Sequence, residues 1–259
     1  MSQKPAGKQP EENVQQAVEG AKEEVTASRR PWYEAIHWGF ILIGVYGVQL
    51  TLFALLAFWV HIHPILPVDV AITKEFQENR SPWLRFTMLA VSYLGANGIL
   101  FSLLVLLTAL VFWELRLRLE ALVVIGLSAV SAILYGAIKL LVARPRPKAP
   151  LVEVIQVVSG QSFPSGHVMS YLAYFGLLFS LGIILFQGKR WWRMGLLIIP
   201  ALFVVLVGPS RIYLGDHWAS DVLGAYLIGG VLLGLTLWLY LRLKKEGVLS
   251  TKGRGEKPV

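Results

Sequence analysis

Apolar residues recur along the chain in long runs, separated by short polar stretches, from about residue 37 to residue 241. A helix that crosses a lipid bilayer needs about 20 predominantly apolar residues. Six of the runs reach this length or come close to it. The pattern therefore predicts six transmembrane helices, near residues 37–60, 96–114, 120–142, 166–187, 192–209 and 218–241.

Two shorter segments between the first two runs have a different pattern. Residues 68–79 are amphipathic, which is typical of a helix lying on the membrane surface. Residues 82–94 are apolar but short, and Arg85 interrupts them. They are expected to form either an interfacial helix or an extension of the second span. The fold class predicted is an all-α integral membrane protein with short interfacial helices on its outer side.

The composition supports a membrane protein and excludes several other classes. Hydrophobic residues make up 55% of the 259 residues and charged residues only 15%, whereas about a quarter of a soluble domain is charged. An intrinsically disordered chain would need low hydrophobicity and high charge. The absence of cysteine rules out a disulfide scaffold, a cysteine-ligated zinc site and a thiolate nucleophile.

Charge distribution indicates how the chain is organised and oriented. Residues 1–35 form a polar tail, expected to be disordered, residues 36–243 the six-span domain, and residues 244–259 a basic tail. The net charge of +8 includes six basic residues within 242–259, directly after an apolar run. This arrangement favours a cytoplasmic membrane-edge anchor over a nucleic-acid patch. With the N-terminus inside, ten Lys and Arg residues lie at inner edges and seven in outer loops. Both termini are then cytoplasmic.

Two of the outer loops carry most of the polar chemistry. One includes residues 139–147 and 161–167, and the other includes residues 210–221. Because two predicted spans lie between the loops, both emerge on the same side of the membrane. We therefore expect their side chains to form one site.

Three cations in these loops suggest an anion-binding site. Lys139 lies near the end of an apolar helix, where an ionisable residue is costly and indicates a functional site. Taken alone, Lys139 could simply extend its ammonium to the interface. Arg146 and Arg211 would add two guanidinium groups, which match phosphate oxygens in pairs. Pro145 and Pro147 stiffen the backbone that carries Arg146.

Residues 164–167, Pro-Ser-Gly-His, open the fourth predicted span. Backbone N–H groups at a helix N-terminus can bind an anion. Gly166 would allow close approach, and Ser165 could donate its hydroxyl. Alternatively, Ser165 is an ordinary N-cap and His167 an interfacial histidine.

His217 and Asp221 are four residues apart at the start of the sixth span, and therefore share a helical face. A carboxylate there can hold one imidazole nitrogen as a donor and leave the other as a nucleophile or base. The alternative is a capping pair at the positive helix end. Asp216 is interpreted as a helix N-cap and Glu153 as a solvated loop charge.

Taken together, the motifs resemble those of a known family. Lys-x6-Arg-Pro, Pro-Ser-Gly-His and Ser-Arg-x5-His-x3-Asp are similar to the three signatures of the type 2 phosphatidic acid phosphatase family, which are integral membrane lipid phosphatases. Soluble vanadium haloperoxidases share the signature. The resemblance covers residues 139–221, and the six-span layout extends it to about 37–241. The positions that support the motifs without chemistry of their own are Pro147, Pro164 and Ser210.

The resemblance implies a role for each motif residue. His217 resembles the nucleophile that forms a phosphohistidine, Asp221 its orienting partner, and His167 the general acid. The residues that resemble the phosphate clamp are Lys139, Arg146 and Arg211, helped by Ser165 and Gly166. No metal or other cofactor is expected, since three cations can stabilise the transferring phosphoryl group.

The function expected is that of a metal-independent lipid phosphatase in the plasma or inner membrane, with its site on the periplasmic or extracellular side. The expected partners are the bilayer and a lipid phosphate, with no nucleic acid. Candidate substrates are a polyprenyl diphosphate such as undecaprenyl diphosphate, phosphatidylglycerol phosphate and phosphatidic acid. Two alternatives stay open, a lipid phosphotransferase that uses the same phosphohistidine and a non-catalytic lipid-binding membrane protein.

Overall fold

A computed structural model describes residues 32–186 and 191–249, and side chains from residue 41, except those of residues 191–193. All regular structure in these ranges is helical, so the all-α prediction is confirmed there. The predicted tails fall largely outside the described residues. The elements are α2 (Trp32–Ile62), α3 (Pro67–Glu78), α4 (Pro82–Ala96), α5 (Gly98–Glu114), α6 (Arg118–Val142), α7 (Gly166–Tyr171), the π-helical turn η1 (Leu172–Gly176), α8 (Leu177–Leu185), α9 (Trp191–Tyr213) and α10 (Ala219–Lys245).

Five helical segments in the described part of the chain are long and apolar enough to cross a membrane. They agree with the first and the third to sixth predicted spans, and α7, η1 and α8 together make one of them. The helices α4 and α5 count as a sixth span only if they are taken together. The structure thus supports a multi-pass membrane protein with five or six spans.

The helices α4 and α5 are separated at Asn97, at the start of the second predicted span. Its side-chain Oδ1 accepts hydrogen bonds from the backbone N–H groups of Ile99 and Leu100, both at 3.1 Å, and so caps the N-terminus of α5. Across this break, α4 and α5 are bent by 73°. Residues 82–94 therefore belong to a separate helix and do not extend the second span in a straight line.

The chain divides into two units, residues 1–48 and residues 49–259. Of the first unit, the structure describes the helical residues 32–48, which open α2. In the second unit, the main core lies among α4 to α10. A Cβ on Gly229 of α10 would come within 2.9 Å of the Leu172 side chain. Gly229 therefore allows close packing of α10 against the η1 turn.

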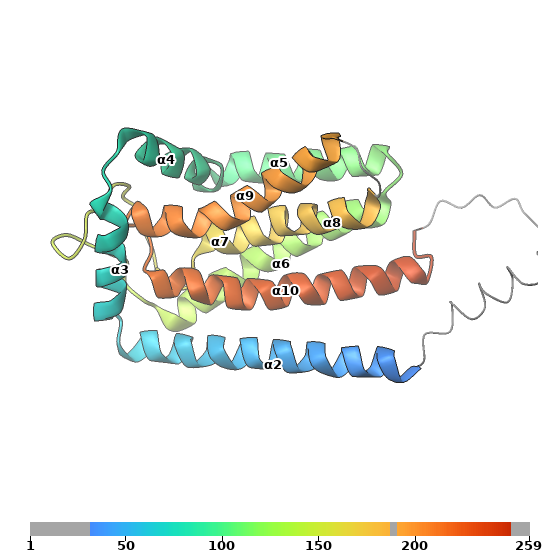
Figure 1. The fold of residues 1–259 in the computed structure, drawn as a ribbon, viewed down its shortest axis with the longest axis horizontal. Helices are drawn as coiled ribbons and strands as arrows, with labels where there is room; N and C mark the ends of the chain where they lie inside the picture. Colours follow the sequence, from blue (N-terminus) through green and yellow to red (C-terminus); the bar gives the residue numbers. More distant parts are fainter. Residues whose placement is uncertain (1–31, 187–190, 250–259) are drawn as a thin grey trace, which may run out of the picture. The chain divides into compact units, whose positions relative to one another are not determined.

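Four helix termini meet at one end of the second unit (Figure 1). They are the C-terminal ends of α6 and α9 and the N-terminal ends of α7 and α10, and α3 lies across this end. Because these termini carry the two predicted outer loops, the fold brings the three motifs to one place.

Candidate active site

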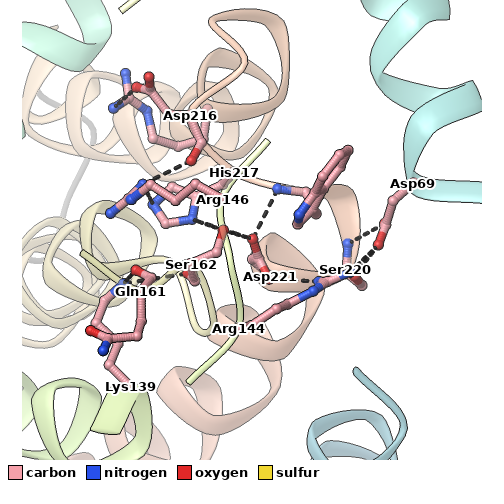
Figure 2. Close-up of polar contacts among 12 residues, drawn as sticks. Asp69, Lys139, Arg144, Arg146, Gln161, Ser162, Asp216, His217, Ser220 and Asp221 are labelled. Atoms are coloured by element: carbon pink, nitrogen blue, oxygen red, sulfur yellow. Dashed lines mark hydrogen bonds and ion pairs between the residues drawn. The ribbon is translucent and has the colours of Figure 1, made fainter. Parts of the chain in front are cut away.

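The two motif-bearing loops meet at His217 and Arg146. Nη1 of Arg146 lies 3.2 Å from Nε2 of His217 and donates to the carbonyl oxygen of Asp216 at 2.8 Å. Its Nε donates to the carbonyl of Gly160 at 3.1 Å. Figure 2 shows the guanidinium of Arg146 lying against the imidazole. Arg146 therefore joins the first motif to the third.

Asp221 lies on the other side of the His217 ring. Its Oδ2 is 3.4 Å from Nδ1 of His217 and accepts the backbone N–H of Trp218 at 2.9 Å. The hydroxyl of Ser162 donates to the same oxygen. Since α10 begins directly after Trp218, Asp221 also caps this helix. The capping and the orienting interpretations of Asp221 are thus compatible.

The neighbours of His217 determine which ring nitrogen carries the proton. The Asp221 carboxylate can only accept and the Arg146 guanidinium can only donate. The favoured tautomer therefore has its proton on Nδ1 and a lone pair on Nε2. Burial lowers the pKa of His217 to about 3, an effect that Asp221 opposes. The ring is consequently neutral near pH 7, as a nucleophile must be.

Asp216 is not a helix N-cap, and that interpretation is wrong. The N-cap position of α10 is occupied by Trp218, and Oδ2 of Asp216 instead forms an ion pair with Nη1 of Arg211 at 2.7 Å. Burial raises the pKa of Asp216 to about 6, although Arg211 and Arg146 oppose the shift. Both side chains of the ion pair are fully buried.

The turn that brings Asp216 and His217 into the site depends on Gly215. Its φ is +71°, and a Cβ there would come within 2.2 Å of the carbonyl oxygen of Glu153. Only glycine fits both constraints. The Glu153 side chain is about half exposed and lies 3.7 Å from Arg80, as expected of a solvated loop charge.

Arg211 has hydrogen-bonding groups to spare. Nη1 lies 3.3 Å from Nε2 of His167, whereas the buried Nε and Nη2 have no hydrogen-bond partner. The buried hydroxyl of Ser165 also lacks one, and it makes no capping bond although Ser165 occupies the N-cap position of α7. Buried donors without partners are rare and call for an explanation. Here they point toward an anionic ligand, and phosphate oxygens would satisfy them.

Lys139 completes the group of cations. Its Nζ donates to the carbonyl oxygens of Gln161 at 2.6 Å and Ser162 at 3.3 Å. The ammonium therefore lies at the end of α6, beside the loop that precedes the second motif, and lines the same cavity as Arg146 and His217. Both interpretations of Lys139, an extension to the interface and a phosphate contact, agree with this position.

The two arginines of the Arg144-Pro-Arg146-Pro sequence have different environments. Arg146 faces His217, while Arg144 lies behind it with a completely buried side chain, bridging Asp69 and Asp221. Sequence reasoning missed Asp69 and Ser162 as neighbours of the site and assigned no role to Arg144. The signal that could have found Arg144 was a second arginine beside the motif, because a buried guanidinium needs an acidic partner.

Gly95 was also missed. A Cβ at this position would come within 2.4 Å of Cδ2 of His167 and 2.8 Å of the Tyr171 ring. The backbone N–H of Gly95 donates to the Tyr171 hydroxyl at 3.1 Å. The end of α4 therefore packs directly on the second motif, and only a residue without a side chain leaves room for the imidazole.

A cavity of about 490 Å³ connects the motif residues to an apolar groove. At its polar end lie the side chains of both histidines. Its other walls come from α5 and α6, including Leu106 and Ile125, which are exposed on the flank of these helices. The arrangement can hold an anionic group beside His217 while an attached apolar chain lies along α5 and α6.

The site residues do not form a cluster suited to a metal ion. Among the residues that the structure describes, no three His, Cys, Asp or Glu side chains converge in this way. Of the two histidines that close the first span, His61 has its Nδ1 3.0 Å from the carbonyl oxygen of Val142. The ring of His63 packs on Trp59, with centroids 4.5 Å apart. Both rings thus have contacts within the described part of the chain.

Comparisons with known proteins give one matching family model and relatives that are named as lipid phosphatases. A family model described as the PAP2 superfamily matches residues 119–245. Phosphatidylglycerophosphatase B of Bacillus subtilis is 32% identical over 196 residues, which cover 74% of this chain and 93% of that protein. An undecaprenyl-diphosphatase of Sulfolobus acidocaldarius is 28% identical over 194 residues, covering 71% of this chain and 85% of the relative.

A solved structure resembles the fold over most of the chain. The crystal structure of a transmembrane PAP2-type phosphatidylglycerolphosphate phosphatase from Bacillus subtilis aligns with a TM-score of 0.65 and 29% identity. The alignment covers 77% of this chain and 98% of the crystallised one.

Proposed function

Since the chain belongs to the PAP2 superfamily, as its motifs predicted, we propose that it is a membrane lipid phosphatase that acts through a phosphohistidine at His217. One observation carries the proposal. Nε2 of His217 lies 3.2 Å from Nη1 of Arg146, at the polar end of a cavity whose other end is apolar. A nucleophile, a cation and a hydrophobic groove together suit a phosphate ester of a lipid.

The first chemical step would be attack by Nε2 of His217 on phosphorus. A P–N bond forms as the bond to the leaving oxygen breaks, and His167 in its protonated form gives that oxygen its proton. Asp221 holds Nδ1–H and stabilises the positive charge that develops on the ring. Arg146, Arg211 and Lys139 neutralise the charge on the phosphoryl oxygens.

The second step would hydrolyse the phosphohistidine. Neutral His167 takes a proton from water, whose oxygen attacks phosphorus while the P–N bond breaks. His217 returns to its neutral form and inorganic phosphate leaves. General acid–base catalysis of this kind is typically worth about 10²–10⁴-fold in rate.

The substrate class follows from the apolar groove and from the relatives. A lipid tail could lie along α5 and α6 without leaving the bilayer, because the groove residues are exposed on the flank of these helices. The named relatives are phosphatases of phosphatidylglycerophosphate and undecaprenyl diphosphate. A polyprenyl diphosphate, phosphatidylglycerol phosphate and phosphatidic acid are therefore the substrates to test.

For the topology, we propose a site on the outer face of the plasma or inner membrane, with both termini in the cytoplasm. The excess of Lys and Arg at the predicted inner edges supports this orientation. In this orientation α3 and α4 are interfacial helices on the outer side. Residues 36–243 are then the phosphatase domain between two cytoplasmic tails.

The test is phosphate release by detergent-purified protein from these three lipids in the presence of EDTA. We expect wild-type turnover, a loss of at least about 10⁴-fold in His217→Ala, as when other catalytic nucleophiles are removed, and near-wild-type rates in the control His63→Ala. His63 is an exposed histidine that directly follows the C-terminal end of α2. Full activity in His217→Ala would refute the mechanism. Transfer of phosphate to an added lipid alcohol, without release, would instead identify a phosphotransferase.

A further inference from the structure

Arg144 makes an unusually complete set of contacts behind the active site. Its Nη1 donates to Oδ1 of Asp221 at 2.7 Å and to the hydroxyl of Ser220 at 2.6 Å. Its Nη2 donates to Oδ2 of Asp69 at 2.7 Å, and its Nε to the carbonyl oxygen of Pro64 at 2.9 Å. The guanidinium, wholly inaccessible to solvent, is therefore held on three sides and cannot reach a substrate.

Asp69 is the outer partner of this arginine. It lies in the first turn of α3 and is buried. Its Oδ1 accepts the backbone N–H of Ser220 at 2.9 Å, and its Oδ2 accepts the Ser220 hydroxyl at 2.6 Å. Figure 2 shows Asp69, Ser220, Arg144 and Asp221 in a row that leads to His217. The row begins on a helix outside the three motifs.

The charges along this row explain why an acid is needed at its far end. Asp221 must be negative to stabilise the cation that forms on His217 when phosphorus is attacked. A buried Arg144 at 2.7 Å would by itself neutralise that carboxylate. Asp69 pairs with Arg144 at the same distance. The group of two carboxylates and one guanidinium therefore keeps a net charge of −1 facing the imidazole.

We propose that Asp69 and Arg144 are positioning residues for catalysis, which fix the Asp221 carboxylate against Nδ1 of His217 and preserve its negative charge. The inference rests on the proposed phosphohistidine mechanism and deepens it. Neither residue touches the substrate. Hydrogen bonds to a residue that orients a catalytic or metal-bound group commonly matter by about 10–100-fold when they are lost.

A purely structural role, in which the row only ties α3 to α10, predicts different behaviour. In that case the variants lower the melting temperature and the yield of folded protein, while kcat per folded molecule stays near the wild-type value. The proposed role depends on charge. Asp69→Asn leaves the group neutral, Arg144→Gln leaves it at −2, and the double variant restores −1.

The experiment measures kcat and KM of Asp69→Asn, Arg144→Gln and the double variant, per amount of monodisperse protein in detergent. We expect kcat to fall about 10-fold or more in Asp69→Asn, with KM within threefold of wild type, and more steeply in Arg144→Gln. The double variant is expected to have a higher kcat than either single variant. Of the three variants, Arg144→Gln is the most prone to misfold. If it does not fold, Asp69→Asn alone still tests the proposal.

The matched control is Glu120→Gln. Glu120 is also a buried carboxylate that pairs with a cation, Lys244 at 2.8 Å, but it lies near the start of α6, far from the site. We expect its kcat to stay within twofold of wild type. Any of three outcomes would overturn the proposal. The first is a kcat within twofold of wild type in Asp69→Asn, and the second is a double variant whose kcat does not exceed that of each single variant. The third is a fall in kcat in Glu120→Gln as large as that in Asp69→Asn.

Failure of this inference can be told apart from failure of the proposed function. If His217→Ala is inactive and Asp69→Asn behaves as wild type, the positioning role is wrong and the phosphohistidine mechanism stands. If His217→Ala retains full activity, the mechanism itself is wrong, and the positioning role is refuted with it.

Discussion

Two polar clusters lie near opposite ends of the helices α6 and α10, and they differ in how completely their buried groups are paired. At the start of α6, Oε1 of Glu120 accepts the Tyr240 hydroxyl at 2.7 Å and Nζ of Lys244 at 2.8 Å. Lys244 also donates to the Tyr240 hydroxyl at 2.7 Å. These three side chains satisfy one another. About 28 Å away along α6, at 1.5 Å per residue, Arg211 and Ser165 keep buried donors without a partner.

The contrast separates a structural cluster from a binding site. Burying a polar group without a hydrogen bond lowers stability, typically by about 1–3 kcal/mol. A cluster that serves only the fold is therefore expected to close on itself, as the one around Glu120 does. The motif end keeps open donors where a phosphate could bind. Single unpaired buried atoms also occur at Gln49, Arg118 and Ser128, so what distinguishes the motif end is that several unpaired donors lie together beside two histidines.

The largest effect expected from this contrast is in Arg211→Lys. The lysine keeps the positive charge but loses the planar pair of donors that matches two phosphate oxygens. We expect kcat/KM to fall about 10²-fold or more, the usual loss when a donor to the developing charge is removed. The control Lys244→Gln should lower the melting temperature and leave kcat/KM within threefold. Steady-state phosphate release measures kcat/KM, and thermal unfolding measures the melting temperature. Equal kcat/KM values for the two variants would show that the unpaired donors of Arg211 have no special role in activity.

A smaller effect is expected in Gly95→Ala. The added methyl group would overlap His167, which must then shift by a fraction of an ångström or more. We expect kcat to fall about 10-fold, because small misplacements of a catalytic group are costly. Gly126→Ala on α6 is the control, since its Cβ would meet no atom within 4 Å. Phosphate release with saturating lipid compares the two, and unchanged kcat in Gly95→Ala would show that the contact with His167 is unimportant.

The smallest effect concerns stability and pH at Asp216. Its pKa is raised to about 6 from an ordinary value near 3.8, so ionisation is harder in the folded protein than in the unfolded one. Wild-type stability relative to Asp216→Asn should therefore fall as the pH rises from about 4 to about 6, and stay level above that. A pKa difference of about two corresponds to about 3 kcal/mol at most.

Melting temperatures of the two proteins at pH 4, 5, 6, 7 and 8 measure this dependence. A difference between them that does not change with pH would mean that the ion pair with Arg211 fully offsets the burial of Asp216.

The sequence predicted the helical, membrane-spanning character of the chain because hydrophobic length is a strong local signal. It could not decide how residues 82–94 relate to the second span. That break depends on the Asn97 side chain, which caps α5 and allows a bend of 73°. A run of apolar residues carries little information about where a helix changes direction.

The motif residues were predicted because their chemistry and spacing are local, and the fold brings them together around His217. Their catalytic roles stay predictions until variants are measured. The neighbours in space were harder to find. Asp69 lies 152 positions before Asp221 in the chain and shares its arginine only after folding. The N-cap interpretation of Asp216 failed because a position just before a helix suggests a cap, whereas the ion pair with Arg211 arises from the Gly215 turn.

The groove along α5 and α6 has a kinetic consequence if it takes the lipid tail as proposed. The substrate would then diffuse to His217 in two dimensions, and its relevant concentration would be its mole fraction in the membrane. Diluting the substrate with inert lipid should slow the enzyme even when the bulk substrate concentration is held constant. A water-soluble phosphate ester, which cannot use the groove that includes Leu106 and Ile125, should show no such surface dilution.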